Sequence, residues 1–197
     1  MHIAISMIDL SFINMKTKIM FMSANDQSNK ILDRNFFERP CVEVARNLLG
    51  KVLVFQNYRG IITETESYRG SDDPASHAFR GPTPRAKIMF GPPGISYVYL
   101  IYGMYNCLNV VTEAEGSPSA VLIRSIKLTK PSHKLIDGPG KICRELGICR
   151  SHNNIDLTSQ EDFHIQEADE VEKFAVTSRI GIKVGTDKLW RFVATIA

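Results

Sequence analysis

The amino-acid sequence predicts an α+β fold in a single domain. Segments with the two-residue alternation of β-strands outnumber segments with the spacing of helices, and most connections between them are short. Short connections favour antiparallel pairing, because parallel strands need a long crossover. The length of 197 residues suits one domain, and an apolar content of 44% is enough for a substantial core.

Residues 1–30 are expected to form a variable N-terminal tail without a function, so that the folded domain spans residues 31–197. Five of the seven methionines lie in this tail. Charged residues interrupt every apolar run in it: Asp9, Lys16 and Lys18. No run is therefore long enough for a membrane span, and the pattern of a signal peptide is not present.

A helix and a hairpin are expected first in the domain. The helix begins at Pro40 and stops at Gly50. Its apolar residues share one face: Cys41, Ala45, Leu48 and Leu49. The hairpin has strands over residues 51–56 and 61–68, joined by a turn at residues 57–60.

Residues 69–94 then form a long loop rich in Gly, Pro, Ser and Asp. A loop of this length inside a compact domain is usually functional or disordered. Two strands follow over residues 97–102 and 106–112, and they are joined tightly through Gly103 and Met104.

The last part of the chain is expected to contain another strand, a short helix and two closing strands. The strand covers residues 120–128, and the helix is capped by Asp137 and ended by Gly147. The inward-facing residues of this helix are Ile142, Cys143 and Leu146. The closing strands cover residues 179–184 and 190–195.

Charge and cysteine content limit the classes of partner and cofactor. The net charge of +3 is compatible with a polyanionic partner but does not require one. The four cysteines contain no Cys-x-x-Cys pair, so neither a zinc site nor a disulfide scaffold is indicated: Cys41, Cys107, Cys143 and Cys149. We expect reduced, mostly structural thiols in a cytoplasmic protein.

Two carboxylates and a tyrosine follow one another on a predicted strand. Strand alternation places Glu64, Glu66 and Tyr68 on one face. This set suits a polar cleft, although the same pattern also occurs on a solvated strand face. His77 follows in the long loop. It is either a surface residue or, with Tyr68, one of two walls of a slot for a flat aromatic ligand.

Four of the six tyrosines lie within residues 97–105. Tyr97 and Tyr99 share one strand face, whereas Tyr102 falls at the tip of the hairpin. Buried tyrosines need hydrogen-bond partners, which makes such a cluster an unfavourable way to fill a core. An exposed tyrosine at a hairpin tip suits a wedge that enters a base stack. The alternative is an aromatic-rich hairpin core.

Basic residues accompany these motifs. Arg85 lies in the long loop, and Arg124 begins a segment with a strong excess of Lys and Arg. The Gly-Pro-Gly-Lys sequence at residues 138–141 combines a lysine with backbone amides at a helix start. Phosphate groups are commonly bound by such a combination, but Gly/Pro turns are also frequent elsewhere.

Together these motifs resemble the alkyladenine (3-methyladenine or methylpurine) DNA glycosylase family. They occur in the family's order from Phe36 to the C-terminus. The matching motifs are Glu64-Thr65-Glu66-Ser67-Tyr68 with His77, Thr83-Pro84-Arg85, the tyrosine hairpin at 97–105, Asn109, Gly138-Pro139-Gly140-Lys141 and Arg179-Ile180-Gly181.

The resemblance implies a curved antiparallel sheet with flanking helices and a protruding β-hairpin that enters the minor groove. It implies a monofunctional DNA-3-methyladenine glycosylase of base-excision repair, which hydrolyses an N-glycosidic bond and leaves an abasic site. The expected substrates are 3-methyladenine, 7-methylguanine, hypoxanthine and ethenoadenine in double-stranded DNA. No metal or other cofactor is expected. The protein would be a monomer without membrane association, in the cytoplasm at a bacterial nucleoid or in a eukaryotic nucleus.

The resemblance also implies roles for individual residues. Glu66 would be the general base, and Arg124 and the carbonyl of Ile180 would help to place the water. The base pocket would comprise Tyr68, His77 and Tyr99 as stacking walls, Tyr97 as a support and Asn109 at the edge of the base. Tyr102 would fill the gap in the duplex. The residues expected at the DNA backbone are Arg85, Gly138, Gly140 and Lys141.

Two alternatives remain at this point. A glycosylase with lyase activity needs an amine nucleophile, so Lys87 or Lys141 would have to lie at the sugar. A catalytically silent nucleic-acid-binding module would use the same hairpin but would not need Glu66.

Overall fold

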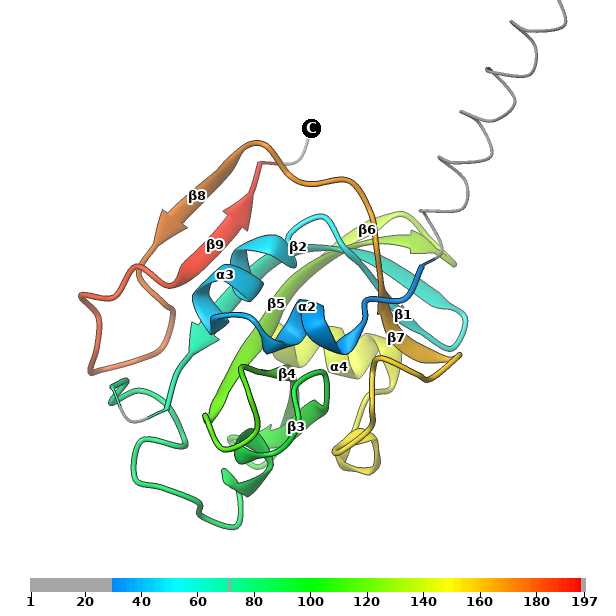
Figure 1. Ribbon diagram of the computed structural model, residues 1–197. Coiled ribbons are helices and arrows are strands. Elements are labelled where there is room, and N and C mark those ends of the chain that lie inside the picture. Colours follow the sequence, from blue (N-terminus) through cyan, green and yellow to red (C-terminus); the bar gives the residue numbers. More distant parts are fainter. Residues whose placement is uncertain (1–29, 71, 196–197) are drawn as a thin grey trace, which may run out of the picture.

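The computed structural model describes residues 30–70 and 72–195 (Figure 1). Within these residues, nine strands form one antiparallel sheet in which β3, β4, β5, β2, β1 and β7 lie side by side in that order. β6 pairs with β5, and β9 pairs with both β2 and β8. The sheet is curved, and short helices flank it (Figure 1). The predicted α+β fold with a curved antiparallel sheet is therefore confirmed.

The strands contain between 4 and 12 residues. Their bounds are β1 Val52–Phe55, β2 Tyr58–Tyr68, β3 Ser96–Ile101, β4 Tyr105–Thr112, β5 Ser119–Lys130, β6 Lys134–Asp137, β7 Phe163–Gln166, β8 Phe174–Thr177 and β9 Arg191–Ala194. The helices are α2 Arg34–Glu38, α3 Cys41–Asn47 and α4 Pro139–Leu146, with 3₁₀ turns at Lys87–Phe90 and Arg150–His152.

The first predicted helix is confirmed, and the hairpin that follows is tighter than predicted. Pro40 is the N-cap residue of α3. After this helix the chain changes direction at Gly50, which has a φ of +85°. Phe55 and Tyr58 are paired across the hairpin, so the turn contains only Gln56 and Asn57. The predicted turn at 57–60 is wrong, because the residues after Asn57 already pair with β1.

Helix α4 has a glycine as the cap residue at each end. Gly147 closes it in the left-handed conformation with a φ of +80°, as predicted. Asp137 does not cap it: this residue ends β6, and the N-cap is Gly138, which makes no side-chain hydrogen bond. Asp137 is the last residue of the strand that pairs with β5, so it lies one residue before the N-cap position. The residues predicted to face inward are buried: Ile142, Cys143 and Leu146.

The C-terminal region differs most from the prediction. β9 lies within the predicted closing strand at 190–195, but residues 179–184 form no strand. The strand that pairs with β9 is β8, which ends at Thr177. Beyond it the chain turns inward at Arg179 and curves through Gly181 and Gly185, both with positive φ. β7 and α2 were not predicted, because neither stands out from its polar surroundings.

Helix α3 packs on one face of β2. The Thr65 hydroxyl donates to the carbonyl of Ala45 at 2.6 Å, and the Ser67 hydroxyl lies 3.0 Å from the sulfur of Cys41. Because successive strand residues point to opposite faces, Glu66 and the other acidic residue of β2 point away from this helix. The apolar core thus holds one face of β2, and the other face is left for a polar site.

The thiols behave as the sequence predicts. All four cysteines are free; Cys41, Cys107 and Cys143 are buried, and Cys149 is exposed. Burial raises the pKa of Cys107 to about 11 and that of Cys143 to about 12, so both are protonated thiols at neutral pH. These side chains serve the packing of the domain.

Apart from Lys30, the predicted N-terminal tail lies outside the described residues. No helix among the described residues is long and apolar enough to cross a membrane.

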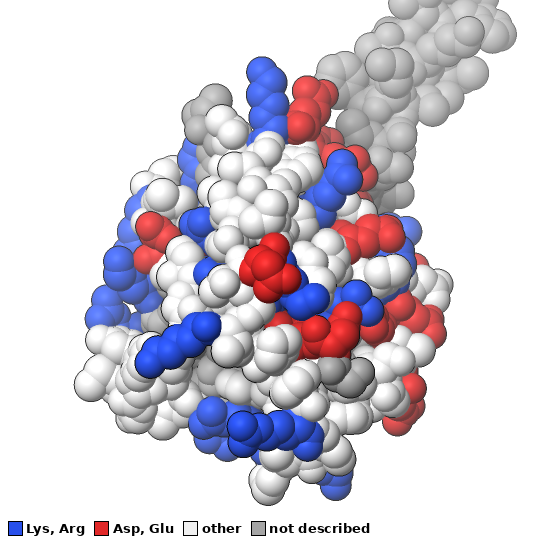
Figure 2. All heavy atoms as spheres, turned by 90° about the vertical axis from the view of Figure 1, so that its left-hand side faces the viewer, with Lys and Arg blue, Asp and Glu red and all other residues white. Residues whose placement is uncertain are grey.

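Charge is distributed unevenly on the face that carries the loop after β2 and the loop between β8 and β9. On this face Lys and Arg gather along the left and lower margins, and Asp and Glu gather toward the centre and right (Figure 2).

Candidate active site

The register of four neighbouring strands aligns the predicted site residues. Tyr97 on β3 pairs with Asn109 on β4, Asn109 pairs with Leu122 on β5, and Leu122 pairs with Glu66 on β2. Residues paired directly across antiparallel strands project from the same face of a sheet. A single row across the sheet therefore joins the tyrosine hairpin to the acidic strand, over 31 residues of chain between Glu66 and Tyr97.

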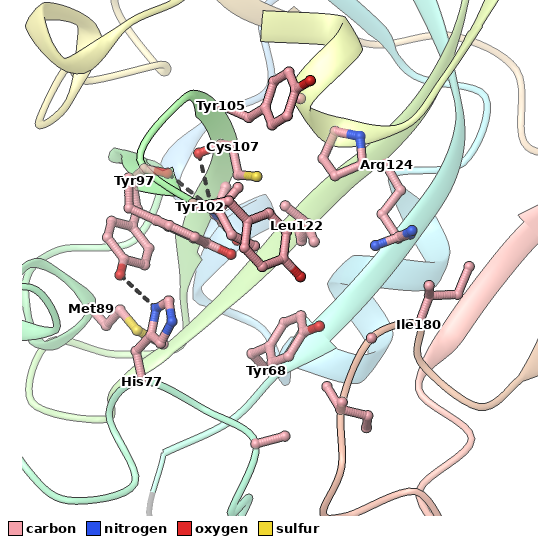
Figure 3. A pocket seen from close by; sticks show the side chains of 18 residues that line it. Tyr68, His77, Met89, Tyr97, Tyr102, Tyr105, Cys107, Leu122, Arg124 and Ile180 are labelled. Atoms are coloured by element: carbon pink, nitrogen blue, oxygen red, sulfur yellow. Dashed lines mark hydrogen bonds between the residues drawn. The ribbon is translucent and has the colours of Figure 1, made fainter.

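A pocket of about 430 Å³ lies over this row (Figure 3). This volume is in the range of small-molecule sites. The pocket brings together nine of the residues predicted from the sequence: Tyr68, His77, Tyr97, Tyr99, Tyr102, Asn109, Arg124, Gly140 and Ile180. Its walls are mostly aromatic and apolar. The hydrogen-bonded pair of His77 and Tyr97 lies at one side, and the guanidinium of Arg124 makes the opposite side, next to Ile180, polar (Figure 3). Such a lining suits a flat, largely apolar ligand.

Glu66 lies beneath this polar side and has no exposed surface. One carboxylate oxygen accepts a hydrogen bond from the backbone amide of Ile180 at 2.7 Å. The other accepts from the hydroxyl of Tyr68 at 2.7 Å and from the guanidinium of Arg124 at 3.4 Å. These three donors, rather than Glu66 itself, line the pocket. The carboxylate is thus held in place from two neighbouring strands and a distant loop.

The environment of Glu66 opposes its ionisation. Burial raises the pKa of this carboxyl above its ordinary value, and the charge of Arg124 and the amide of Ile180 counteract that rise. A base with a raised pKa accepts protons more readily. Glu64 is also buried and is shared between Arg124 and Arg191, at 2.9 and 2.5 Å from their Nε atoms. The alternative of a solvated strand face is therefore wrong.

Ile180 approaches the site through a different atom from the one expected. The family resemblance implies a role for its carbonyl, whereas the structure directs its amide nitrogen to Glu66. Its side chain is about half-exposed at the rim of the pocket. The chain that carries it enters the site from the loop between β8 and β9.

His77 and Tyr97 form a hydrogen-bonded pair in the wall. The imidazole Nδ1 lies 2.8 Å from the hydroxyl of Tyr97, and the ring packs edge-on against Tyr99 at 4.7 Å. Burial, with the positive charge of Arg85, holds the pKa of His77 below its ordinary value. The imidazole is therefore neutral at pH 7, and it presents an uncharged edge to the pocket.

Asn109 is fixed at the floor of the pocket. Its side chain is buried, and its amide nitrogen donates to the carbonyls of Tyr97 at 3.1 Å and Cys107 at 3.4 Å. Both bonds are drawn in Figure 3. With the nitrogen occupied, the side-chain carbonyl oxygen is the polar atom that remains for a ligand.

Tyr102 occupies the tip of the hairpin in an unusual conformation. Its φ is +53° and that of Gly103 is +71°, and the amide of Met104 donates to the carbonyl of Ile101 at 3.2 Å. Positive φ at both central residues defines the tight hairpin turn that matches strand twist, but a tyrosine there is strained. Its side chain is 83% exposed. Strain and exposure of a large aromatic residue are typical of a functional position.

The predicted backbone-binding residues lie around the pocket. Arg85 is exposed, and its guanidinium lies 5.8 Å from the ring centre of Tyr99. Gly140 lies against Tyr105, so that an added Cβ would be only 3.0 Å from that side chain. Gly138 precedes it with a φ of +121°, and Lys141 is exposed on the first turn of α4. The start of α4 is therefore packed against the base of the hairpin.

Two buried residues of the site were given no role from the sequence, namely Asp73 and Arg179. They form an ion pair in which both side chains have no exposed surface. They are 106 residues apart, so no local pattern could have joined them. Arg179 belongs to the matching motif at residues 179–181, whereas Asp73 had only its charge as a signal.

The part of the chain that the structure describes brings no cluster of metal ligands and no lysine to the lining of this pocket. No group of three or more His, Cys, Asp or Glu side chains in residues 30–70 and 72–195 could hold a metal ion. No lysine is among the described residues that line the pocket, which removes the geometric basis for Lys87 or Lys141 as an amine nucleophile.

Comparison with known proteins agrees with the family resemblance found in the sequence. Residues 35–196 match the family model described as methylpurine-DNA glycosylase. A protein from Sodalis glossinidius, named as a 3-methyladenine DNA glycosylase, is 57% identical over 165 residues, which cover 84% of this chain and 97% of its own. Similarly named proteins from Wolbachia pipientis of Culex pipiens and from Rickettsia felis are both 54% identical. These matches cover 86% and 84% of this chain and 92% and 93% of theirs.

Proposed function

The chain belongs to the methylpurine-DNA glycosylase family, and from this membership and the site we propose that it excises damaged purines from duplex DNA in base-excision repair. The observation that carries the proposal is a buried carboxylate at the base of an aromatic pocket, beside an exposed tyrosine at a hairpin tip. A base inside a duplex cannot reach such a pocket, so the nucleotide must be flipped out of the stack. The glycosylase domain is proposed to span residues 31–197 and to act as a monomer.

The proposed reaction is hydrolysis of the N-glycosidic bond. Glu66 takes a proton from a water molecule as the water oxygen forms a bond to C1′ of the sugar, and the bond from C1′ to the purine nitrogen breaks with its electron pair going to the base. Arg124 lies beside the carboxylate, and its positive charge favours the ionised form by lowering the pKa of Glu66. A purine that carries positive charge, such as 3-methyladenine, leaves as a neutral base and needs no acid.

The walls of the pocket suit such a purine. Tyr68 and His77 present aromatic rings to the cavity (Figure 3), and Tyr99 also lines it. An electron-poor cationic ring is attracted to aromatic faces by about 0.5–2 kcal/mol. The neutral state of His77 avoids a repulsive charge next to that cation. The proposed substrate class comprises 3-methyladenine, 7-methylguanine, hypoxanthine and ethenoadenine.

Release of free base from defined duplexes tests this proposal. Duplexes with a single 3-methyladenine, 7-methylguanine, hypoxanthine or ethenoadenine are incubated with the protein, and the free base and the abasic strand are quantified. We expect base release without strand cleavage and without a protein–DNA adduct under borohydride. Failure to release any of these bases would contradict the function, and a trapped adduct would indicate an amine nucleophile.

The pH dependence of base release should report the ionisation of Glu66. Burial raises the pKa of this carboxyl, so the rate should fall on acidification with a midpoint above that of an ordinary glutamate, about 4.3. The charge of Arg124 lowers the same pKa. Arg124→Gln should therefore move the midpoint to higher pH as well as reduce the rate. Single-turnover base release measured across pH checks both effects.

Arg191→Gln is the matched control for this shift. It removes the same charge from the same cluster, but Arg191 pairs with Glu64 rather than with Glu66. Its midpoint should stay close to that of the parent. Equal midpoints in the parent and in Arg124→Gln would show that the acidic limb belongs to another group.

Asn109 should control discrimination against guanine. Guanine differs from adenine and hypoxanthine by an exocyclic amino group on its minor-groove edge. The fixed side chain of Asn109 on the pocket floor is proposed to exclude that group. Asn109→Ser shortens the side chain and removes the steric clash, so release of normal guanine should rise above the parent's background, by about tenfold if the clash costs roughly 1.4 kcal/mol.

The measurement is guanine release from undamaged duplex, with hypoxanthine release as the internal reference. Guanine release that stays at background while hypoxanthine release persists would assign discrimination to another part of the pocket.

A further inference from the structure

A buried arginine lies directly behind the pocket. Arg179 forms two parallel hydrogen bonds with Asp73, from Nη1 at 2.5 Å and from Nη2 at 2.8 Å. Nη1 also donates to the carbonyl of Ser67 at 2.9 Å. An arginine whose two terminal nitrogens are engaged in this way is held in one orientation, which lysine cannot reproduce. The guanidinium therefore occupies a fixed position next to β2.

The same guanidinium lies close to two aromatic rings. Its central carbon lies 4.6 Å from the ring centre of Tyr68 and 5.3 Å from that of Trp190. Tyr68 lines the pocket, so the guanidinium supports this wall from behind. Trp190 is in turn tied to β2, because its carbonyl accepts from the amide of Ser67 at 2.9 Å. The stacking wall thus has a rigid, charged backing.

Arg179 also joins three chain segments around the site. Ser67, whose carbonyl it binds, lies between Glu66 and Tyr68 on β2. Asp73 belongs to the loop that leads to His77, and it also accepts from the backbone amides of Arg69 and Ala75, at 3.3 and 3.1 Å.

The third segment is the loop that contains Arg179 itself. The next residue, Ile180, delivers its amide to Glu66 at 2.7 Å. Further along, the carbonyl of Gly185 accepts from Nη2 of Arg179 at 3.4 Å. A Cβ on Gly185 would lie 3.3 Å from that nitrogen, and its φ of +65° also favours glycine. The loop is therefore closed tightly around the guanidinium.

We propose that Arg179 and Asp73 form a positioning clamp for base excision, which holds the Ile180 amide on Glu66 and the Tyr68 ring against the flipped purine. This inference rests on the proposed function. The clamp touches neither the water nor the base. It acts through the Ile180 amide, which holds Glu66, and through Tyr68, which faces the base. A displacement of about 1 Å in groups that position a reaction can cost about a hundredfold in rate.

Arg179→Lys is the first test, because it retains the charge beside Asp73 and loses the paired geometry. At neutral pH, single-turnover base release should fall about 10- to 100-fold. The acidic limb of its pH profile should also move to higher pH, since the Ile180 amide is one of the groups that keep the pKa of Glu66 down. Trp190, the single tryptophan of the chain, should report the altered stack as a change in fluorescence emission.

Asp73→Asn is the second variant. It preserves shape and one acceptor oxygen but removes the negative charge, and it should produce the same two changes to a smaller degree. Both variants are assayed below their melting temperatures, determined by circular dichroism. If either variant does not fold at the assay temperature, the other decides the outcome.

Lys51→Met is the matched control for a purely structural effect. Lys51 is also buried, and it bonds to the side chain of Glu167 and to the carbonyl of Ala168, away from the pocket. Its loss should lower the melting temperature without moving the acidic limb. The clamp is refuted if the Arg179 and Asp73 variants lose no more activity than Lys51→Met and keep the parent's pH profile. Absence of base release in the parent would instead refute the proposed function.

Discussion

Glu66→Gln should lose nearly all base release while it keeps its affinity for lesion-containing duplex. The amide is almost the same size as the carboxylate, and its single oxygen can still accept from the backbone amide of Ile180, but it cannot take a proton from water. Removal of a general base typically costs about a hundred- to ten-thousand-fold in rate. The measurement pairs single-turnover base release with equilibrium binding to the same duplex.

Glu64→Gln is the matched control. It makes the same chemical change two residues away on the same strand face, in a carboxylate that pairs with Arg124 and Arg191. Glu64 does not carry the proposed proton transfer, so its variant should lose far less activity. Near-normal turnover in Glu66→Gln, together with a severe loss in Glu64→Gln, would transfer the role of general base to Glu64.

Tyr102→Ala should weaken excision from normally paired duplex by about tenfold to a hundredfold. A flipped base leaves a gap in the stack. When the base returns to this gap, it recovers an unstacking energy of a few kcal/mol, so an empty gap favours the unflipped state. The exposed tyrosine at the hairpin tip is positioned to occupy such a gap. Its removal leaves Glu66 and the pocket walls in place, so the loss should appear in the flipping equilibrium rather than in the bond-breaking step.

Comparison of paired and mispaired lesions separates these two steps. A lesion in a mismatch flips at lower cost, so Tyr102→Ala should lose less activity there. Tyr102→Phe keeps the ring and should behave like the parent in both contexts. An equal loss of Tyr102→Ala in both contexts would mean that Tyr102 supports the pocket or the fold, and the wedge role would have to be abandoned.

The sequence alone was sufficient where function depends on local alternation. Glu66 and Tyr68 share a strand face because side chains alternate every residue, and Tyr97 and Tyr99 share another for the same reason. The exposed position of Tyr102 followed from the short connection at Gly103, which leaves a bulky side chain outside the strand pair. These features need only a few neighbouring residues, so they were predicted and are confirmed in the structure.

Contacts between distant segments were decided only by the tertiary structure. The Ile180 amide reaches Glu66 across 114 residues, and Arg179 reaches Asp73 across 106. The sequence at 179–184 has the composition of a strand, but the buried ion pair and the positive φ of Gly181 turn the chain into the site instead. The packing of the whole sheet determines which distant residues pair, because a buried charge is tolerated only where the fold supplies an opposite charge.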